Sequence, residues 1–208
     1  LIESGIENGG LLAYHHLESF SSKGVTTDPS TGKEFSITDY DPLARTLYVT
    51  PNYLEIQDVP VSPEEKDYLN HLQAGEFGLL LPEKLKGRED EMIKRYEDYL
   101  SPRDDQGNIT LSMKAQVTYI PNHQKRFIYN NTPISYKQFF TDPVLVVIQP
   151  ESFGGYVNPY FTHLNPYLYF NGLQNSKKLI AEYNLEKSVS QYDYAVDVYQ
   201  QMAKFIQI

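Results

Sequence analysis

The sequence predicts an α+β fold: a mixed, mostly antiparallel sheet with packed helices and a C-terminal stalk helix that projects from the domain. Short runs rich in β-branched and aromatic residues are interspersed with helical segments, without the regular alternation of a doubly wound parallel sheet. The hydrophobic share of 40% over 208 residues is enough for a real core. We assign residues 1–184 to one α+β domain, as a single unit or two lobes, and residues 185–208 to the stalk helix.

The N-terminal part is expected to contain extended chain, a hairpin and a strand. Apolar residues suggest a helix in residues 1–20, but the glycines there would each cost about 1 kcal/mol, so extended chain or a broken helix is expected. Residues 28–33 are dense in turn formers and predict a hairpin loop between strands at 23–27 and 34–38. Good β formers predict a further strand at 45–50.

Two helices follow. Residues 62–65 read Ser-Pro-Glu-Glu: the serine suits the N-cap, the proline suits the first helical position, and the second glutamate can reach back to the cap amide. This helix is expected to end at Gly75. A second helix is predicted at residues 88–100, with an apolar face and a charged face on which Glu91 and Arg95 pair at i,i+4.

The remaining strands are predicted from short apolar or alternating runs. Residues 77–81 read as a buried strand, and so do residues 145–148, part of the longest apolar run. After a turn at residues 104–108, the alternating segments 109–120 and 126–129 are typical of sheet strands.

The end of the chain carries a heptad pattern. Its apolar residues alternate at spacings of four and three, as in the seam of a coiled coil, at Leu185, Val189, Tyr192, Val196, Tyr199, Ala203 and Ile206. No Gly, Asn or Pro follows Lys204 to end the helix, and the chain begins at Leu1 rather than Met. We therefore expect a piece of a longer polypeptide whose stalk helix continues; the alternative is a helix docked on its own domain.

The composition argues against several classes of function and site. The formal net charge is −9 and there is no block of Lys or Arg, which argues against nucleic-acid binding. The absence of Cys removes disulfides, thiolate nucleophiles and Cys-based zinc sites. No apolar run approaches the roughly 20 residues that a membrane-spanning helix needs.

No catalytic, cofactor or metal site is predicted. The neighbouring His15 and His16 point to different faces, and the other histidines stand alone, so no metal-ligand spacing exists. Asp104 opens a turn that lacks the alternating acidic ligands of a calcium loop. Ser152 follows a strand but is not in a G-x-S-x-G elbow. The acidic pairs are adjacent in sequence and lie in charged stretches. We therefore expect a protein that is not an enzyme.

An aromatic segment at residues 156–171 is the best candidate for binding a partner. Its rings are interleaved with Asn side chains, and we single out Tyr156, Tyr160, Phe161, Tyr167 and Tyr169. If these rings are exposed, they form an adhesive surface for a peptide or glycan, since large aromatics concentrate binding energy. If they are buried, the segment is a core strand interrupted by proline.

One stretch also resembles a known family. Residues 47–55 read LYVTPNYLE and resemble the YVNPNYLK signature of bacteriocin-associated integral membrane proteins, and residues 79–84 are similar to the family's LVPEKYK. The strand at 143–148, before Gln-Pro-Glu, is similar to a later block. The fragments keep their order across residues 45–150 and depart from the pattern at Thr50, Glu55 and Leu85.

The resemblance implies a multi-spanning membrane protein of Gram-positive bacteria, related to ABC-transporter permeases, with one large extracellular domain. It implies no catalytic residue. On this basis the chain is expected to be that extracellular domain, at the cell membrane, acting in export, sensing or immunity toward bacteriocins and other antimicrobial peptides. Its expected partners are a peptide or an envelope protein, and an ABC ATPase subunit through the parent protein.

The net charge agrees with a peptide-binding function, and two alternative functions stay open. A domain with net charge −9 attracts cationic peptides at low salt. The first alternative is a secreted surface enzyme, a peptidase or glycosidase. The second is a surface adhesin or assembly module whose Tyr-rich face binds a protein partner.

Overall fold

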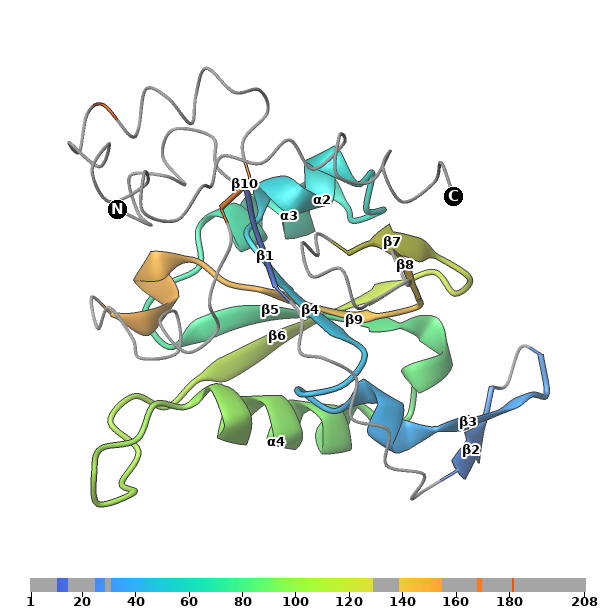
Figure 1. Ribbon diagram of the computed structural model, residues 1–208, viewed down its shortest axis with the longest axis horizontal. Helices are drawn as coiled ribbons and strands as arrows, with labels where there is room; N and C mark the ends of the chain where they lie inside the picture. Colours follow the sequence, from blue (N-terminus) through green and yellow to red (C-terminus); the bar gives the residue numbers. More distant parts are fainter. Residues whose placement is uncertain are drawn as a thin grey trace.

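The computed structural model describes residues 11–14, 25–28, 31–128, 139–154, 168–169 and 181. These residues form an α+β fold with a mixed sheet and packed helices, as the sequence predicts. In Figure 1, helices lie on both sides of the central sheet. Within the described ranges, no helix combines the length and the apolar character needed to cross a bilayer.

Among the described residues, the main sheet has six strands in the order β10-β1-β4-β9-β5-β6. The pairs β10–β1, β1–β4 and β9–β5 are antiparallel, whereas β4–β9 and β5–β6 are parallel. The sheet is therefore mixed and mostly antiparallel. Its strands are β1 (Leu11–Tyr14), β4 (Thr46–Val49), β5 (Glu76–Pro82), β6 (Lys114–Ile120), β9 (Val144–Val147) and β10 (Leu168–Tyr169).

Two small antiparallel sheets flank the main one: β2 (Val25–Thr27) with β3 (Glu34–Ser36), and β7 (Lys125–Phe127) with β8 (Phe139–Thr141). The first is the predicted hairpin. Its turn is closed by a hydrogen bond from the Asp28 amide to the Lys33 carbonyl, and Gly32 adopts φ of 66°.

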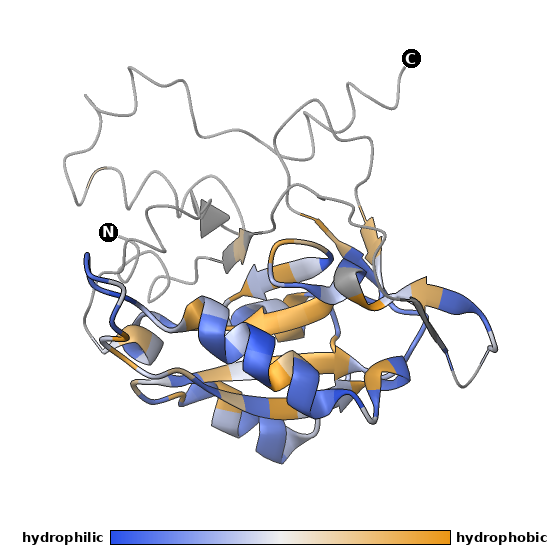
Figure 2. Cartoon of the chain, turned by 90° about the horizontal axis from the view of Figure 1, so that it is seen from below, coloured by the Kyte–Doolittle hydropathy of each residue, from blue (hydrophilic) through white to orange (hydrophobic). Residues whose placement is uncertain are grey.

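The helices divide between the two faces of the sheet. Helices α2 (Asn52–Ile56) and α3 (Pro63–Asn70) lie on one face, and α4 (Glu89–Leu100) lies on the other (Figure 1). Of the 3₁₀ helices in the described residues, η1 (Ile37–Tyr40) lies between β3 and β4, η2 (Glu83–Leu85) lies between β5 and α4, and η3 (Pro150–Phe153) follows β9. Figure 2 shows hydrophobic residues gathered in the strands and hydrophilic ones on the helices.

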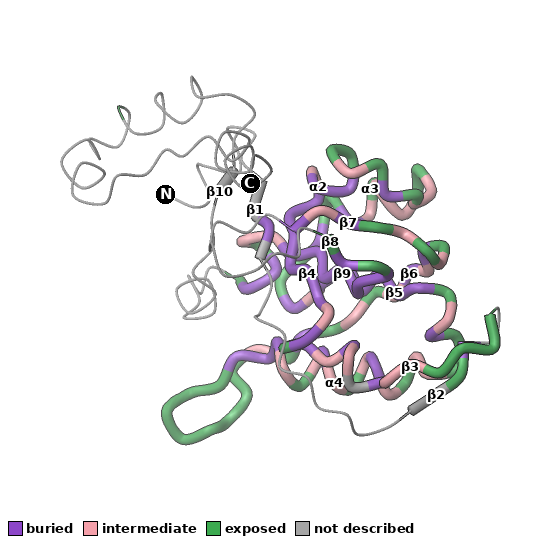
Figure 3. The backbone as a smooth tube through the Cα atoms, turned by 45° about the vertical axis from the view of Figure 1, so that its right-hand side comes forward, coloured by how far each residue is buried: buried purple, intermediate pink, exposed green. Residues whose placement is uncertain are grey.

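Strand β9 shows why the sheet is apolar on both faces. Val144 and Val146 belong to the core under α4, whereas Leu145 and Val147 belong to the core under α2 and α3. All four residues are fully buried, and buried residues run along β4, β9 and β5 in Figure 3. A continuous apolar run is thus the expected sequence of a strand covered on both sides.

The predicted helix signals are confirmed. The Ser62 amide donates to Glu65 Oε2 at 2.9 Å, and the Glu65 amide donates to Ser62 Oγ at 3.2 Å, which completes the capping box. Helix α4 buries Met92, Tyr96 and Leu100 against the sheet and leaves its other side to solvent.

Several predicted boundaries were wrong. Helix α3 ends at Asn70 rather than Gly75, which instead takes φ of 84° beside the Ser112 carbonyl in the turn into β5. The strand predicted from residue 109 begins at Lys114. Its first residues form a loop because the Thr110 amide bonds back to the Pro102 carbonyl, and Ile109 joins only an isolated bridge.

Other parts of the prediction were missed or fall elsewhere. The short helix α2 and strand β8 were not predicted. The strand expected at 126–129 is β7, which begins one residue earlier, at Lys125, and ends at Phe127. The stalk helix predicted at residues 185–208 lies outside the described residues, so its projection from the domain stays a prediction.

Candidate functional site

The aromatic residues predicted to bind a partner are only partly described. Tyr169 lies in β10, where its backbone pairs with Leu11 of β1 at an edge of the main sheet. Tyr156, Tyr160, Phe161 and Tyr167 lie outside the described residues. Their role as a binding surface therefore stays a prediction.

Of the side chains considered for chemistry, His15 and His16 lie outside the described residues, whereas Asp104 and Ser152 have structural partners. The Asp104 carboxylate accepts hydrogen bonds from the amides of Gln106 and Asn108, and so holds its own turn. Ser152 is fully buried, and its Oγ accepts the Gln149 amide in η3. Within the part of the chain that the structure describes, no group of three His, Cys, Asp or Glu side chains is placed to hold a metal ion.

An open groove runs along α4 and the loop that leads into β6. It has a volume of about 780 Å³ and is lined by residues of α4 and of the 101–113 loop. Ile93 and Ile109 give it apolar surface, and the side chain of Ile109 is 49% exposed. Charged residues surround them: Asp90, Lys94, Glu97 and Asp98.

The acidic residues of the groove differ in how they are engaged. Asp98 pairs with Arg103 at 2.5 Å, and Glu97 accepts from the Ala115 amide at 3.1 Å and from Lys114 Nζ at 3.2 Å. Asp90 is exposed, and its side chain has no hydrogen bond or ion pair with another described residue. The groove therefore offers at least one carboxylate for an outside cation.

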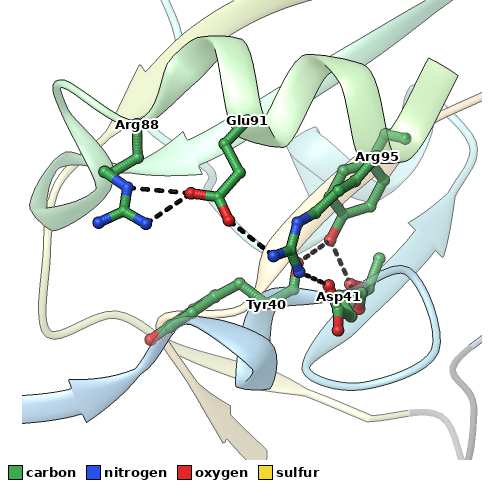
Figure 4. A network of polar contacts seen from close by, with 7 residues as sticks. Tyr40, Asp41, Arg88, Glu91 and Arg95 are labelled. Atoms are coloured by element: carbon green, nitrogen blue, oxygen red, sulfur yellow. Dashed lines mark hydrogen bonds and ion pairs between the residues drawn. The ribbon is translucent and has the colours of Figure 1, made fainter. Parts of the chain in front are cut away.

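A polar network fixes α4 to the loop after η1 (Figure 4). The Arg95 guanidinium bonds to Asp41 and, at 2.6 Å, to Glu91 Oε1, while Glu91 Oε2 accepts from Arg88. The Arg88 hydrogen bond and, after it, the charges of both arginines hold the pKa of Glu91 below its usual range. Because these charged side chains pair with one another, they stabilise the wall of the groove rather than offering charges to a ligand.

Tyr96 anchors the same helix from its buried side. Its hydroxyl donates to the Tyr40 carbonyl at 2.8 Å and lies 2.6 Å from Thr46 Oγ1. Burial raises the pKa of the Tyr96 phenol well above its ordinary value. Helix α4 is therefore held from beneath by hydrogen bonds and at its flank by ion pairs.

A second polar cluster lies at the far end of β5. Lys84 Nζ is 2.8 Å from Asp142 Oδ2, and it also lies 5.3 Å from the ring centroids of Phe35 and Tyr40. Burial lowers the pKa of Lys84, but the stabilisation of its charged form by Asp142 and Tyr40 together outweighs burial, so the pKa is raised. The pair is enclosed, with side chains 9% and 3% exposed, and so joins the chain rather than offering a ligand site.

Only one contact in these clusters was predicted from a local sequence pattern. The Glu91–Arg95 pair follows from its i,i+4 spacing, and the structure confirms it. The contacts of Arg95 with Asp41 and of Lys84 with Asp142 join residues 54 and 58 positions apart, for which no local pattern exists. The groove depends on the loop after Ser101, part of which was predicted as the start of a strand.

Comparison with known proteins identifies no relative: no protein-family model, curated protein or solved structure matches the chain.

Proposed function

We propose that the chain is the extracellular domain of a permease-like membrane protein of Gram-positive bacteria. In this proposal it acts without catalysis in the export or sensing of bacteriocins and other antimicrobial peptides, or in immunity toward them. The parent protein works at the cell membrane with an ABC ATPase subunit.

The observation that carries the proposal is the open groove beside α4. An open groove lined by apolar and charged residues, several of them carboxylates, suits a peptide better than a small metabolite, which needs an enclosed pocket. The exposed Asp90 and the net charge of −9 favour a cationic peptide.

The arrangement of the family-like blocks supports the proposal from another side. Residues 47–55 form β4 and α2, residues 79–84 end β5 and enter η2, and residues 143–148 contain β9. Because β4, β9 and β5 are neighbours in the sheet, the blocks form one continuous core. A resemblance that falls on contiguous core strands is consistent with a shared domain fold.

Binding of a lysine-rich synthetic peptide to the full 208-residue chain tests the proposal. The variant Asp90→Asn/Asp98→Asn removes two carboxylates from the groove and should weaken binding several-fold at low salt, with the difference shrinking at about 1 M salt. The matched control Glu64→Gln/Asp67→Asn removes two exposed carboxylates from α3, on the other face of the sheet. In cells, the groove variant of the parent protein should lower peptide resistance or export.

Two results would contradict the proposal. Equal loss of binding in the groove variant and the α3 control would mean that only net charge matters. Unaltered resistance and export in cells carrying the groove variant, at normal protein levels, would remove this surface from the function.

A second candidate, an assembly module for an envelope protein, is favoured by apolar exposure on the other face. Phe139 of β8 is 51% exposed and packs edge-to-face on Phe127 of β7, with ring centroids 5.5 Å apart. Ile56 of α2 is also exposed. Replacing Phe139 with Ser should then reduce association with an envelope partner, measured by cross-linking in cells, while peptide binding persists.

A further inference from the structure

Strand β6 is an edge of the main sheet: among the described residues it pairs only with β5. The Lys114 amide donates to the Gly75 carbonyl, so Lys114, Gln116 and Thr118 turn their backbone groups toward β5. Because these directions alternate along a strand, Ala115, Val117 and Tyr119 turn theirs outward.

The outward groups are mostly unpaired within the described part of the chain. Glu97 Oε1 accepts the Ala115 amide at 3.1 Å. The carbonyl of Ala115 and both backbone groups of Val117 and Tyr119 have no hydrogen bond to another described residue. Such an edge can pair with another extended chain.

Helix α4 lies alongside this edge and supplies side chains at a matching spacing. Glu89 bonds the Tyr119 hydroxyl at one end of β6, and Glu97 bonds the Ala115 amide at the other, so helix and strand run antiparallel. Ile93 lies midway between the two acids on the helix. Residues four apart on a helix are about 6 Å apart along its axis, and alternate residues of a strand are about 6.6 Å apart.

We propose that the β6 edge binds an extended peptide segment as an added strand. The segment carries a basic residue, an apolar residue and a second basic residue at alternate positions, which face Glu97, Ile93 and Glu89. Backbone hydrogen bonds to Val117 and Tyr119 supply affinity, and the two carboxylates, each with further acceptor capacity, select the basic residues. This inference rests on the proposed function and names the binding mode and the class of peptide.

A second copy of the chain fits this edge less well. Two β6 strands paired antiparallel about Val117 would bring Glu97 of one copy toward Glu89 of the other, at both ends of the contact. Like charges across a strand pair are destabilising. A peptide carries no α4 and can place basic residues at those positions.

The test is fluorescence anisotropy of a labelled nonapeptide that has lysines two residues before and after a central valine, titrated with the full chain. Val117→Pro removes an outward amide and leaves the β5 ladder intact, so it should weaken binding at least tenfold without changing the thermal midpoint. The matched control Val117→Thr keeps the amide and should bind like the wild type. A peptide with glutamates in place of the lysines should bind at least tenfold more weakly.

If Val117→Pro fails to fold, N-methylation of the alternate peptide amides gives the same test on the wild-type chain. If the Val117→Pro variant binds the peptide as tightly as the wild type does, or if the N-methylated peptide binds as tightly as the unmodified one, the peptide does not add to the β6 edge as a strand. A concentration-dependent dimer in sedimentation that Val117→Pro abolishes would assign the edge to a second copy. If lysine-rich peptides bind, and Asp90→Asn/Asp98→Asn weakens this binding but Val117→Pro does not, then binding at the β6 edge is wrong and the proposed function stands.

Discussion

The ammonium of Lys84 is paired with the carboxylate of Asp142 inside the protein, at 2.8 Å and almost out of contact with water. The pair joins η2, after β5, to the turn before β9, and Asp142 also accepts the Gln124 amide at 2.8 Å. Asp142 adopts φ of 52°, a conformation that Asp and Asn tolerate better than most residues. One carboxylate thus ties together three separate chain segments.

Breaking this pair from one side should be strongly destabilising. Asp142→Asn keeps the backbone preference but leaves the Lys84 ammonium buried without its counter-charge, and should lower the free energy of unfolding by about 3–5 kcal/mol. Urea unfolding measures the change, and the exposed Asp67→Asn serves as control. The double variant Lys84→Met/Asp142→Asn should lose less than the sum of the single losses; strict additivity would contradict a coupled pair.

The buried phenol of Tyr96 should make the protein less stable at alkaline pH. Its pKa is raised in the folded state by burial, so above about pH 10 the unfolded chain releases this proton while the folded chain keeps it. The free energy of unfolding should therefore fall as pH rises through 10 toward the folded pKa, by about 1.4 kcal/mol per pH unit for this group.

Tyr96→Phe isolates that contribution. At pH 7 the variant loses the hydrogen bonds to Tyr40 and Thr46 and should be about 1–3 kcal/mol less stable. Above pH 10 its stability should fall less steeply than that of the wild type, because one titrating group is gone. Urea unfolding at pH 7, 10 and 11 measures both the stability difference at pH 7 and the decrease in unfolding free energy above pH 10. If the two proteins lost stability equally steeply above pH 10, the alkaline dependence could not be attributed to Tyr96.

Local sequence signals predicted most of the helices and strands, whereas contacts between distant residues set where these elements begin and end. The Ser62 capping box, the hairpin turn at Gly32 and the apolar face of α4 depend on neighbours within a few residues, and all were predicted. The start of β6 was misjudged because residues 109–113 alternate like a strand but are held in a loop by the Pro102 carbonyl.

The candidate site was predicted less well than the fold. The sequence drew attention to an aromatic segment of which the structure describes only the backbone of Tyr169 and its neighbour. The groove and the β6 edge depend instead on how α4 lies beside the sheet. Ile93, Glu97 and Val117 are ordinary residues of a helix and a strand, and only their packing gives them a common surface.

Two leucines test whether β9 is the centre of the core. Leu145→Ala deletes a fully buried side chain in a strand covered on both faces and should cost about 2–5 kcal/mol of unfolding free energy. Leu43→Ala makes the same chemical change at a side chain that is 46% exposed and should change stability by less than about 0.5 kcal/mol. Similar losses in both variants, measured by urea unfolding, would contradict this arrangement.

Gly78 tests how closely α3 packs on β5. A Cβ at this position would overlap Leu69 Cδ2 of α3 and lie 3.1 Å from Val147 Cβ of β9. Leu69 is buried and has little room to move, so Gly78→Ala should cost about 1–3 kcal/mol through overpacking. Shortening Leu69 to Ala creates a cavity on its own, but the double variant Gly78→Ala/Leu69→Ala fills part of that space. Its loss, measured by urea unfolding, should therefore be smaller than the sum of the two single losses. A double variant that loses the full sum would mean that the new methyl clashes with β9 rather than with α3.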